Sequence, residues 1–181
     1  MNRVGRPFFA FVIRRKSNNV SSTIVPSQRR SARVILLNAA HQILLIRYVT
    51  QRGELPFVFW ATPGGGVERG ESDNQAARRE LIEELGLDLP LADPIHSVTS
   101  EFVHEGVLTV STDVFFLGHC PRSDLSLGFA SPAEQAAMTG FRWWSIDEID
   151  SAAETIFPVD LAEILRTKAA VSAMTRILAG L

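Results

Sequence analysis

Residues 64–87, GGGVERGESDNQAARRELIEELGL, place three consecutive glycines ahead of a segment that is unusually rich in glutamate. Within it, Ser72 is a suitable helix N-cap, and Gln75 three residues later completes a capping box. Gly86 suits the left-handed position that follows the last turn of a helix. These signals predict a helix over residues 73–85, bounded by its own chemistry at both ends.

Three glutamates of this helix, Glu80, Glu83 and Glu84, fall on one face, beside the apolar stripe that faces the core. Like charges at this spacing repel by a few tenths of a kcal/mol per pair, and Arg79 at i−4 from Glu83 neutralises only part of the excess. A hard divalent cation with oxygen ligands would offset the repulsion. A solvated acidic surface is the alternative explanation. The glycines before the helix, which let the backbone approach a ligand, favour the metal site.

Residues 65–87 resemble the Nudix box, G-x5-E-x7-R-E-U-x-E-E-x-G-U, in which U is aliphatic. All nine defined positions match: Gly65, Glu71, Arg79, Glu80, Leu81, Glu83, Glu84, Gly86 and Leu87. The flanking stretches FWATPGGG and FRWWSIDEI are similar to the surroundings of the box in bacterial, MutT-like members, and with them the resemblance spans residues 31–180.

The resemblance implies an α/β (α+β) fold, an α/β/α sandwich around a mixed β-sheet, and a pyrophosphohydrolase that cleaves nucleoside diphosphates linked to another moiety. In such a site Glu80, Glu83, Glu84 and the carbonyl of Gly65 would hold Mg²⁺, with Mn²⁺ as an alternative. The cation would bridge phosphate oxygens and lower the pKa of a bound water.

The resemblance leaves the general base open. Glu80 is one candidate, and a carboxylate from a distant loop is the other, with Glu134 first and Glu101 second. Arg79 and Glu71 are expected to orient the site, Arg79 by bracing a glutamate and Glu71 by tying the loop to the helix.

The expected substrate is a nucleoside triphosphate, intact or damaged, which would yield a monophosphate and pyrophosphate. The alternatives are ADP-ribose or a nucleotide sugar and, from another class, a non-catalytic module that senses nucleotides. The candidate substrate-binding residues are Arg33, Arg47, Trp60, Gly65 and Gly66, and Arg52 could also meet a phosphate. The alternative is that these residues have no role in binding, because arginines near strands are often solvated surface residues and alternating aromatic residues in strands often belong to the core.

The chain as a whole predicts one domain over residues 31–181 that follows a basic arm, residues 1–30. With 46% hydrophobic and 21% charged residues, the composition is that of a globular protein. Residues 1–53 hold ten basic and no acidic side chains, against eight basic and twenty acidic in the remainder. The arm resembles a transit peptide in composition, but a flexible arm or an over-extended start fits equally.

Cys120 is the only cysteine, which excludes an internal disulfide, predicts a buried thiol and fits a cytoplasmic location. No apolar run is long enough for a membrane helix. The unbroken box and the lack of a recognisable helix-turn-helix argue against a sensing regulator. Nucleic acid is not the expected partner, although the basic arm could contact it or an anionic surface, and a homodimer stays open.

Alternation predicts strands over residues 32–37, 42–49, 57–62, 94–106, 107–119 and 141–146, with a turn at residues 105–106. Residues 120–135 are predicted to form a long loop, and residues 160–180 an amphipathic helix. Trp143 and Trp144 should face opposite sides of their strand, one of them buried.

Overall fold

The computed structural model describes residues 26–52, 54–104, 107–121, 125–128 and 132–167. Within these ranges eight strands lie in one sheet. They are β1 (Ser27–Leu37), β2 (Ile43–Arg52), β3 (Leu55–Ala61), β4 (Gly64–Gly66), β5 (His96–His104), β6 (Val107–His119), β7 (Met138–Trp144) and β8 (Thr155–Phe157). The helices are α1 (Asp73–Leu85), α2 (Pro132–Ala137), α3 (Ile146–Asp150) and α4 (Leu161–Arg166).

The sheet is mixed, with strand order β5-β6-β1-β2-β3-β8, while β4 pairs with β1 and β7 with β2. The β1–β6 and β3–β8 pairs are parallel and the other pairs antiparallel. The expected antiparallel pairing of the first two strands is therefore confirmed. In its middle, at residues 31–33, β1 pairs with β4 instead of β2, so the glycine segment is itself part of the sheet.

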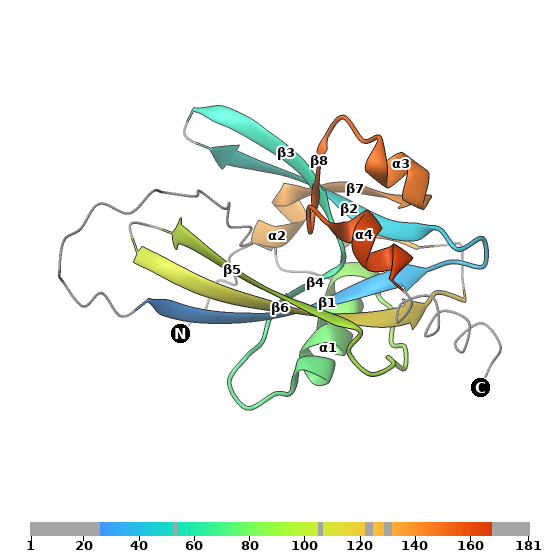
Figure 1. Ribbon diagram of the computed structural model, residues 1–181, viewed down its shortest axis with the longest axis horizontal. Coiled ribbons are helices and arrows are strands. Elements are labelled where there is room, and N and C mark those ends of the chain that lie inside the picture. Colours follow the sequence, from blue (N-terminus) through green and yellow to red (C-terminus); the bar gives the residue numbers. More distant parts are fainter. Residues whose placement is uncertain (1–25, 53, 105–106, 122–124, 129–131, 168–181) are drawn as a thin grey trace.

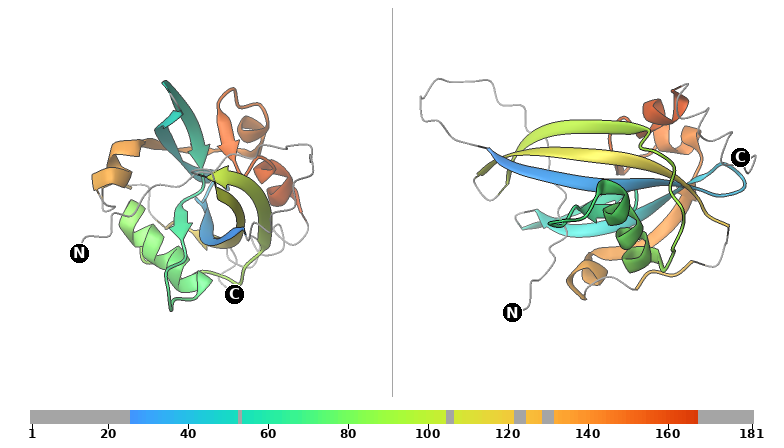
Figure 2. Two further views of the ribbon diagram at one scale, coloured as in Figure 1. Left: turned by 90° about the vertical axis from the view of Figure 1, so that its left-hand side faces the viewer. Right: turned by 90° about the horizontal axis from the view of Figure 1, so that it is seen from below.

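Two apolar clusters pack on opposite faces of the sheet, as the alternation along β1 demonstrates. Val34 and Leu36 belong to the cluster that includes α1, whereas Ile35 and Leu37 belong to the cluster that includes α3 and α4. Figure 1 and Figure 2 show α1 on one side of the sheet and the α3–α4 pair on the other. The expected α/β/α sandwich is confirmed.

The helix α1 has the predicted bounds and caps. Ser72 and Gln75 form the capping box, with the Ser72 hydroxyl accepting from the Gln75 amide and the Ser72 amide donating to the Gln75 side chain. Gly86 adopts φ 63°, ψ 27° and ends the helix in the left-handed region. Local sequence chemistry thus sets the position of the glutamates along the chain.

Other element bounds differ from expectation. The first strand begins at Ser27, so residues 27–30 of the expected arm lie in the sheet, and residues 1–25 lie outside the described residues. The expected loop over residues 120–135 gives way to α2 at Pro132. The last expected strand over residues 141–146 is β7, which begins at Met138 and ends at Trp144 because Ser145 caps α3.

The expected long C-terminal helix begins at Leu161, but α4 ends at Arg166, where Thr167 turns to an extended conformation. Residues 168–180 of that prediction, and the predicted turn at residues 105–106, lie outside the described residues. Cys120 is buried, and so is Trp144, whereas Trp143 packs against the opposite cluster, as expected. None of the helices that the structure describes has the length and apolar character needed to cross a bilayer.

Candidate functional site

The turn between β3 and β4 is fixed by an arginine of β1. Arg33 is buried, and its Nη1 donates to the carbonyl of Gly64 at 2.7 Å and to that of Thr62 at 3.4 Å. Gly64 itself has φ +129°, and a Cβ there would stand 2.2 Å from the Ala32 carbonyl oxygen. Only glycine fits this position without strain. The absence of a side chain lets the turn pack directly against the main chain of β1.

Glu84 is held by both of its carboxylate oxygens. The hydroxyl of Tyr48 on β2 donates to Oε1 at 2.8 Å, and the amide of Gly64 donates to Oε2 at 2.8 Å. Burial and then the negative charge of Glu80 raise the pKa of Glu84 to about 8, against the opposing effect of these two donors. The two hydrogen bonds orient the Glu84 carboxylate. Its ionised form costs free energy in this buried position unless a positive charge lies beside it.

Glu80 lies against the main chain of Gly65. A Cβ built on Gly65 would stand 2.4 Å from Glu80 Oε1, so the carboxylate occupies space that any other residue would fill. Burial raises the pKa of Glu80, although the charge of Arg79 opposes that shift. The two buried glutamates therefore share a small volume beside the glycine turn.

Arg79 joins the helix to the loop before it. Its Nη1 donates at 2.9 Å to both Glu80 and Glu83, and its Nη2 donates at 2.9 Å to Glu71 and to the Gly66 carbonyl. Burial acts to lower the pKa of Arg79, but the Glu71 hydrogen bond and the charge of Glu80 raise it above its usual value. Glu71 also accepts from the Glu68 amide at 2.6 Å, which closes the loop onto the helix.

The donor set suits a hard divalent cation chemically. Two buried carboxylates with raised pKa values, next to a main chain without side-chain obstruction, are oxygen donors whose charges such a cation would neutralise. In the described part of the chain, however, no three carboxylate, histidine or cysteine side chains stand together as a metal cage. Glu83 in particular is half-exposed and paired with Arg79.

Two predicted substrate-binding residues lie on the other face of the sheet. Trp60 is in the cluster of α3 and α4, and its Nε1 donates to Glu154 at 2.6 Å. Arg47 Nη2 donates to the same carboxylate at 3.0 Å. The structure thus does not bring Trp60 and Arg47 to the glutamates of α1, because their strand positions have the opposite parity from Tyr48.

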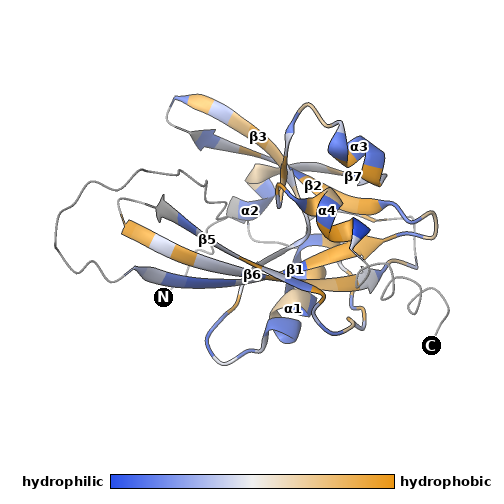
Figure 3. Ribbon diagram, viewed as in Figure 1, coloured by the Kyte–Doolittle hydropathy of each residue, from blue (hydrophilic) through white to orange (hydrophobic). Residues whose placement is uncertain are grey.

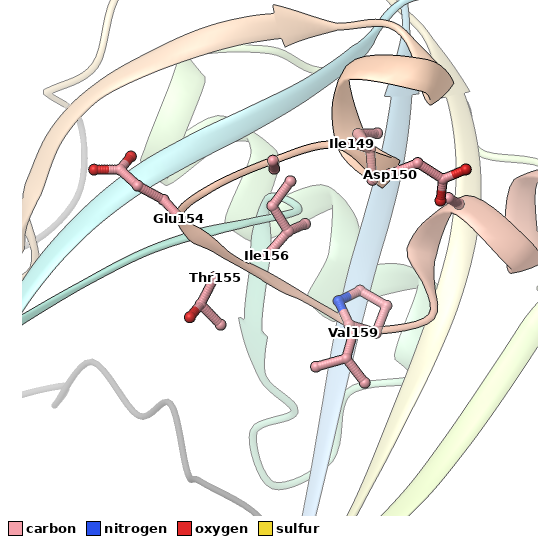
Figure 4. A pocket seen from close by; sticks show the side chains of 9 residues that line it. Ile149, Asp150, Glu154, Thr155, Ile156 and Val159 are labelled. Carbon is pink, nitrogen blue, oxygen red and sulfur yellow. The ribbon is translucent and has the colours of Figure 1, made fainter.

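A cavity of about 280 Å³ on that same face is lined by residues of α3, β8, α4 and the segments that join them. Figure 4 shows Asp150, Glu154, Thr155 and Val159 around it. Its lining includes none of the box residues, so it is separate from the carboxylate site.

The remaining candidates lie as follows. Glu134 is on α2, which packs through Ala137 into the cluster of α1, and so stands on the side of the sheet that carries the box. Glu101 is exposed on β5. Gly66 contributes its carbonyl to Arg79. The side chain of Arg52 lies outside the described residues.

The Tyr48 hydroxyl, which donates to Glu84, is not among the site groups that the sequence predicted. The available signal was its alternation with Leu44 and Ile46, which predicts a buried ring whose hydroxyl needs a partner. Arg33 was predicted to contact substrate, and the structure uses its Nη1 to hold the glycine turn.

The chain is similar to known proteins over part of its length. A zebrafish (Danio rerio) oxidized purine nucleoside triphosphate hydrolase is 40% identical over 90 residues, which is 50% of this chain and 51% of that protein. A nucleoside triphosphatase, NudI, of Salmonella heidelberg is 52% identical over 50 residues, 28% of this chain and 35% of the relative. These matches thus span about half or less of the curated relatives.

The crystal structure of a MutT protein from Methanosarcina mazei superposes with a TM-score of 0.58 at 20% identity, covering 77% of this chain and 91% of the other. At that identity the likeness concerns the fold. Residues 27–166, from the first residue of β1 to the last of α4, match the NUDIX domain. The chain therefore belongs to the NUDIX domain family.

Proposed function

We propose that this protein is a Mg²⁺-dependent pyrophosphohydrolase that converts a nucleoside triphosphate, intact or oxidatively damaged, to the monophosphate and pyrophosphate. The observation that carries the proposal is the pair of buried carboxylates, Glu80 and Glu84, held beside the glycine turn. Buried like charges are costly unless a partner offsets them. A divalent cation that also binds phosphate oxygens is such a partner.

The protein's own groups supply orientation. The Tyr48 hydroxyl and the Gly64 amide fix Glu84, and Gly65 leaves room for Glu80 at the main chain. The cation would be bound by Glu80, Glu84 and the Gly65 carbonyl, and also by Glu83 once that side chain leaves its ion pair with Arg79. Bound there, the cation would neutralise phosphate charge and activate water. Arg79 then keeps its contacts with Glu71 and the Gly66 carbonyl and holds the loop in register with the helix.

The general base in this proposal is a carboxylate outside the cation's ligands, and Glu134 is the first candidate. It lies on α2, on the side of the sheet that carries α1, whereas Glu101 is exposed on the β5 edge strand. Glu80 stays the alternative base. A general base must reach the attacking water in the substrate complex. We therefore rank the candidates by whether they lie on the side of the sheet that carries α1.

The names of two relatives support the proposed substrate class. The zebrafish relative acts on oxidized purine nucleoside triphosphates and the Salmonella relative on nucleoside triphosphates, as their names state. We extend that class to this chain. ADP-ribose, nucleotide sugars and ligand sensing without hydrolysis are the alternatives that an assay must separate.

The test is release of phosphate or pyrophosphate from a panel of canonical and oxidized nucleoside triphosphates, ADP-ribose, nucleotide sugars and dinucleoside polyphosphates, each with Mg²⁺, Mn²⁺ or EDTA. Glu84→Gln removes a charge at the site, and Glu68→Gln removes the same charge at an exposed position of the same segment. We expect turnover to fall at least a hundredfold in Glu84→Gln and to stay within twofold of wild type in Glu68→Gln.

The outcomes separate the alternatives. Metal-dependent pyrophosphate release from triphosphates supports the proposal, whereas hydrolysis of ADP-ribose or a nucleotide sugar alone changes the substrate class and keeps the reaction. Binding of a nucleotide without turnover of any panel member by folded, metal-loaded protein overturns the enzyme assignment. Wild-type kcat in Glu84→Gln at saturating Mg²⁺ overturns its assignment as a ligand.

A further inference from the structure

The cavity bounded by α3, β8 and α4 lies apart from the carboxylate site. Six of its nine lining residues are apolar, and its volume of about 280 Å³ lies just below the ~300–1,000 Å³ of small-molecule sites. Val159 in this lining is 82% exposed, which makes it the most exposed large apolar side chain of the described residues. An exposed apolar patch with a polar rim is typical of a surface that binds another segment of protein.

The rim of this cavity is acidic. Asp150 and Glu154 belong to the lining, and Figure 4 shows them on opposite sides of Ile156. Residues 145–165, which supply the whole lining, contain six acidic and no basic side chains. Figure 3 shows hydrophilic and hydrophobic residues mixed along α3 and α4. The cavity therefore combines an apolar interior with an excess of negative charge around it.

The described cations near the cavity neutralise only part of this charge. Glu154 pairs with Arg47 at 3.0 Å, and Asp150 pairs with Arg166. Two further acidic residues, Asp160 directly after Val159 and Glu163 on α4, make no ion pair with any described residue. A partner that carries several positive charges is therefore favoured at this surface.

The chain itself contains a segment of complementary composition. Residues 1–25 hold five basic and no acidic side chains, and the apolar run PFFAFVI, residues 7–13, directly precedes Arg14, Arg15 and Lys16. Bulky apolar side chains suit the interior of the cavity, and the three cations suit its rim. The linking residues 17–26 can span up to ~35 Å, against a radius of gyration of about 14 Å for a domain of this size, so the run can reach the cavity.

We infer that the cavity between α3, β8 and α4 is the docking site of the basic arm of the same chain. Residues 7–13 pack against its apolar lining, and residues 14–16 pair with its acidic rim. Among the described strands β8 pairs only with β3, so the main chain at this edge of the sheet is open to hydrogen bonds from a docked segment. A segment tethered by a short linker binds at an effective concentration on the order of millimolar, so modest contacts suffice.

Hydrogen–deuterium exchange of the full chain, followed by mass spectrometry, tests the docking. We expect the amides of residues 8–13 to exchange at least tenfold more slowly than those of a free synthetic peptide of residues 6–16, because docking buries and hydrogen-bonds them. Val159→Lys places a positive charge in the cavity at a side chain that is already 82% exposed, and should remove most of that protection. Leu55→Lys makes the same change at a side chain that is 73% exposed on the β2–β3 hairpin, outside the cavity, and should keep it.

A charge reversal in the arm tests the same contact without any change in the cavity. The triple variant Arg14→Glu, Arg15→Glu and Lys16→Glu should remove the protection of residues 8–13 and speed exchange at residues 155–157 of β8. Salt at 1 M should weaken the protection in the wild-type chain, because the Debye length falls to about 3 Å. Circular dichroism checks that each variant is folded.

Exchange of residues 8–13 at the rate of the free peptide would overturn the inference, and it is the result expected of an arm that serves only as a targeting segment. Equal protection in the wild-type chain and in Val159→Lys would overturn the cavity as the docking site. Protection that is lost on dilution of the protein would show that the arm of a second copy occupies the cavity, and would overturn docking within one chain. Val159→Lys should leave turnover of the substrate panel within twofold of wild type, because the cavity includes none of the box residues, so the docking and the proposed function stand or fall separately.

Discussion

Gly65→Ala tests whether the glycine segment serves the carboxylate site rather than the fold. The added methyl would stand 2.4 Å from Glu80 Oε1 and 2.6 Å from its Cδ, whereas ordinary contact begins at 3.4 Å. The carboxylate must therefore retreat by roughly 1 Å, and a displacement of that size in a catalytic site can cost ~100-fold in rate. Because the atoms it meets end a flexible side chain, the helix and the sheet can stay in place.

We expect Gly65→Ala to lower kcat/KM about a hundredfold on the best substrate of the panel and to weaken Mn²⁺ binding, followed by electron paramagnetic resonance. Its melting temperature should stay within about 3 °C of wild type, corresponding to a change of about 1 kcal/mol. Gly66→Ala adds the same methyl where no atom lies within 4 Å of the new Cβ, and should keep wild-type stability and Mn²⁺ affinity. Wild-type turnover and metal affinity in Gly65→Ala would refute the contact with Glu80 as a determinant of the site.

Three further variants distinguish effects on folding from effects on the carboxylate site. Gly64→Ala should prevent folding or cost more than ~3 kcal/mol, measured by urea denaturation, because its Cβ would meet the Ala32 carbonyl oxygen at 2.2 Å and its φ is +129°. Tyr48→Phe should lower the melting temperature by about 3–10 °C, since a buried carboxylate oxygen loses its donor at a cost of ~1–3 kcal/mol; an unchanged melting temperature would contradict that bond. In EDTA, the raised pKa of Glu84, about 8, means that the folded state binds its proton more tightly than the unfolded state, so stability is lost as pH rises from about 4.5 to about 8. Glu84→Gln should flatten that decline in a melting-temperature series, and an equally steep decline in the variant would refute the burial argument.

Local chemistry made the central helix predictable. The cap at Ser72, the capping box with Gln75 and the stop at Gly86 all act within a few residues, so the sequence alone places the glutamates on one helix face. The pairing of Arg79 with Glu83 follows from the i,i+4 spacing in the same way. The α/β/α class was predictable because it followed from the resemblance of the box and its flanks.

The face of each strand residue was harder to predict. The sheet is covered on both sides, so Ile43, Leu44, Leu45 and Ile46 form an unbroken buried apolar run. Such a run contains no alternation that tells which parity meets α1. Arg47 was predicted to contact substrate because it lies on one of the first strands, and in the structure its side chain pairs with Glu154, 107 residues later.

The parallel pairing of β1 with β6 also has consequences for how the chain assembles. Each residue of β1 pairs with one 82 positions later, as Ser27 does with Thr109. Contacts across such a separation form late, because the entropy of closing the loop must be overcome first. The glycine turn rests on β1, so the carboxylates of α1 gain their final setting only when β6 has docked. A chain stopped before Val107 would contain every residue of the box and still lack the strand that supports it.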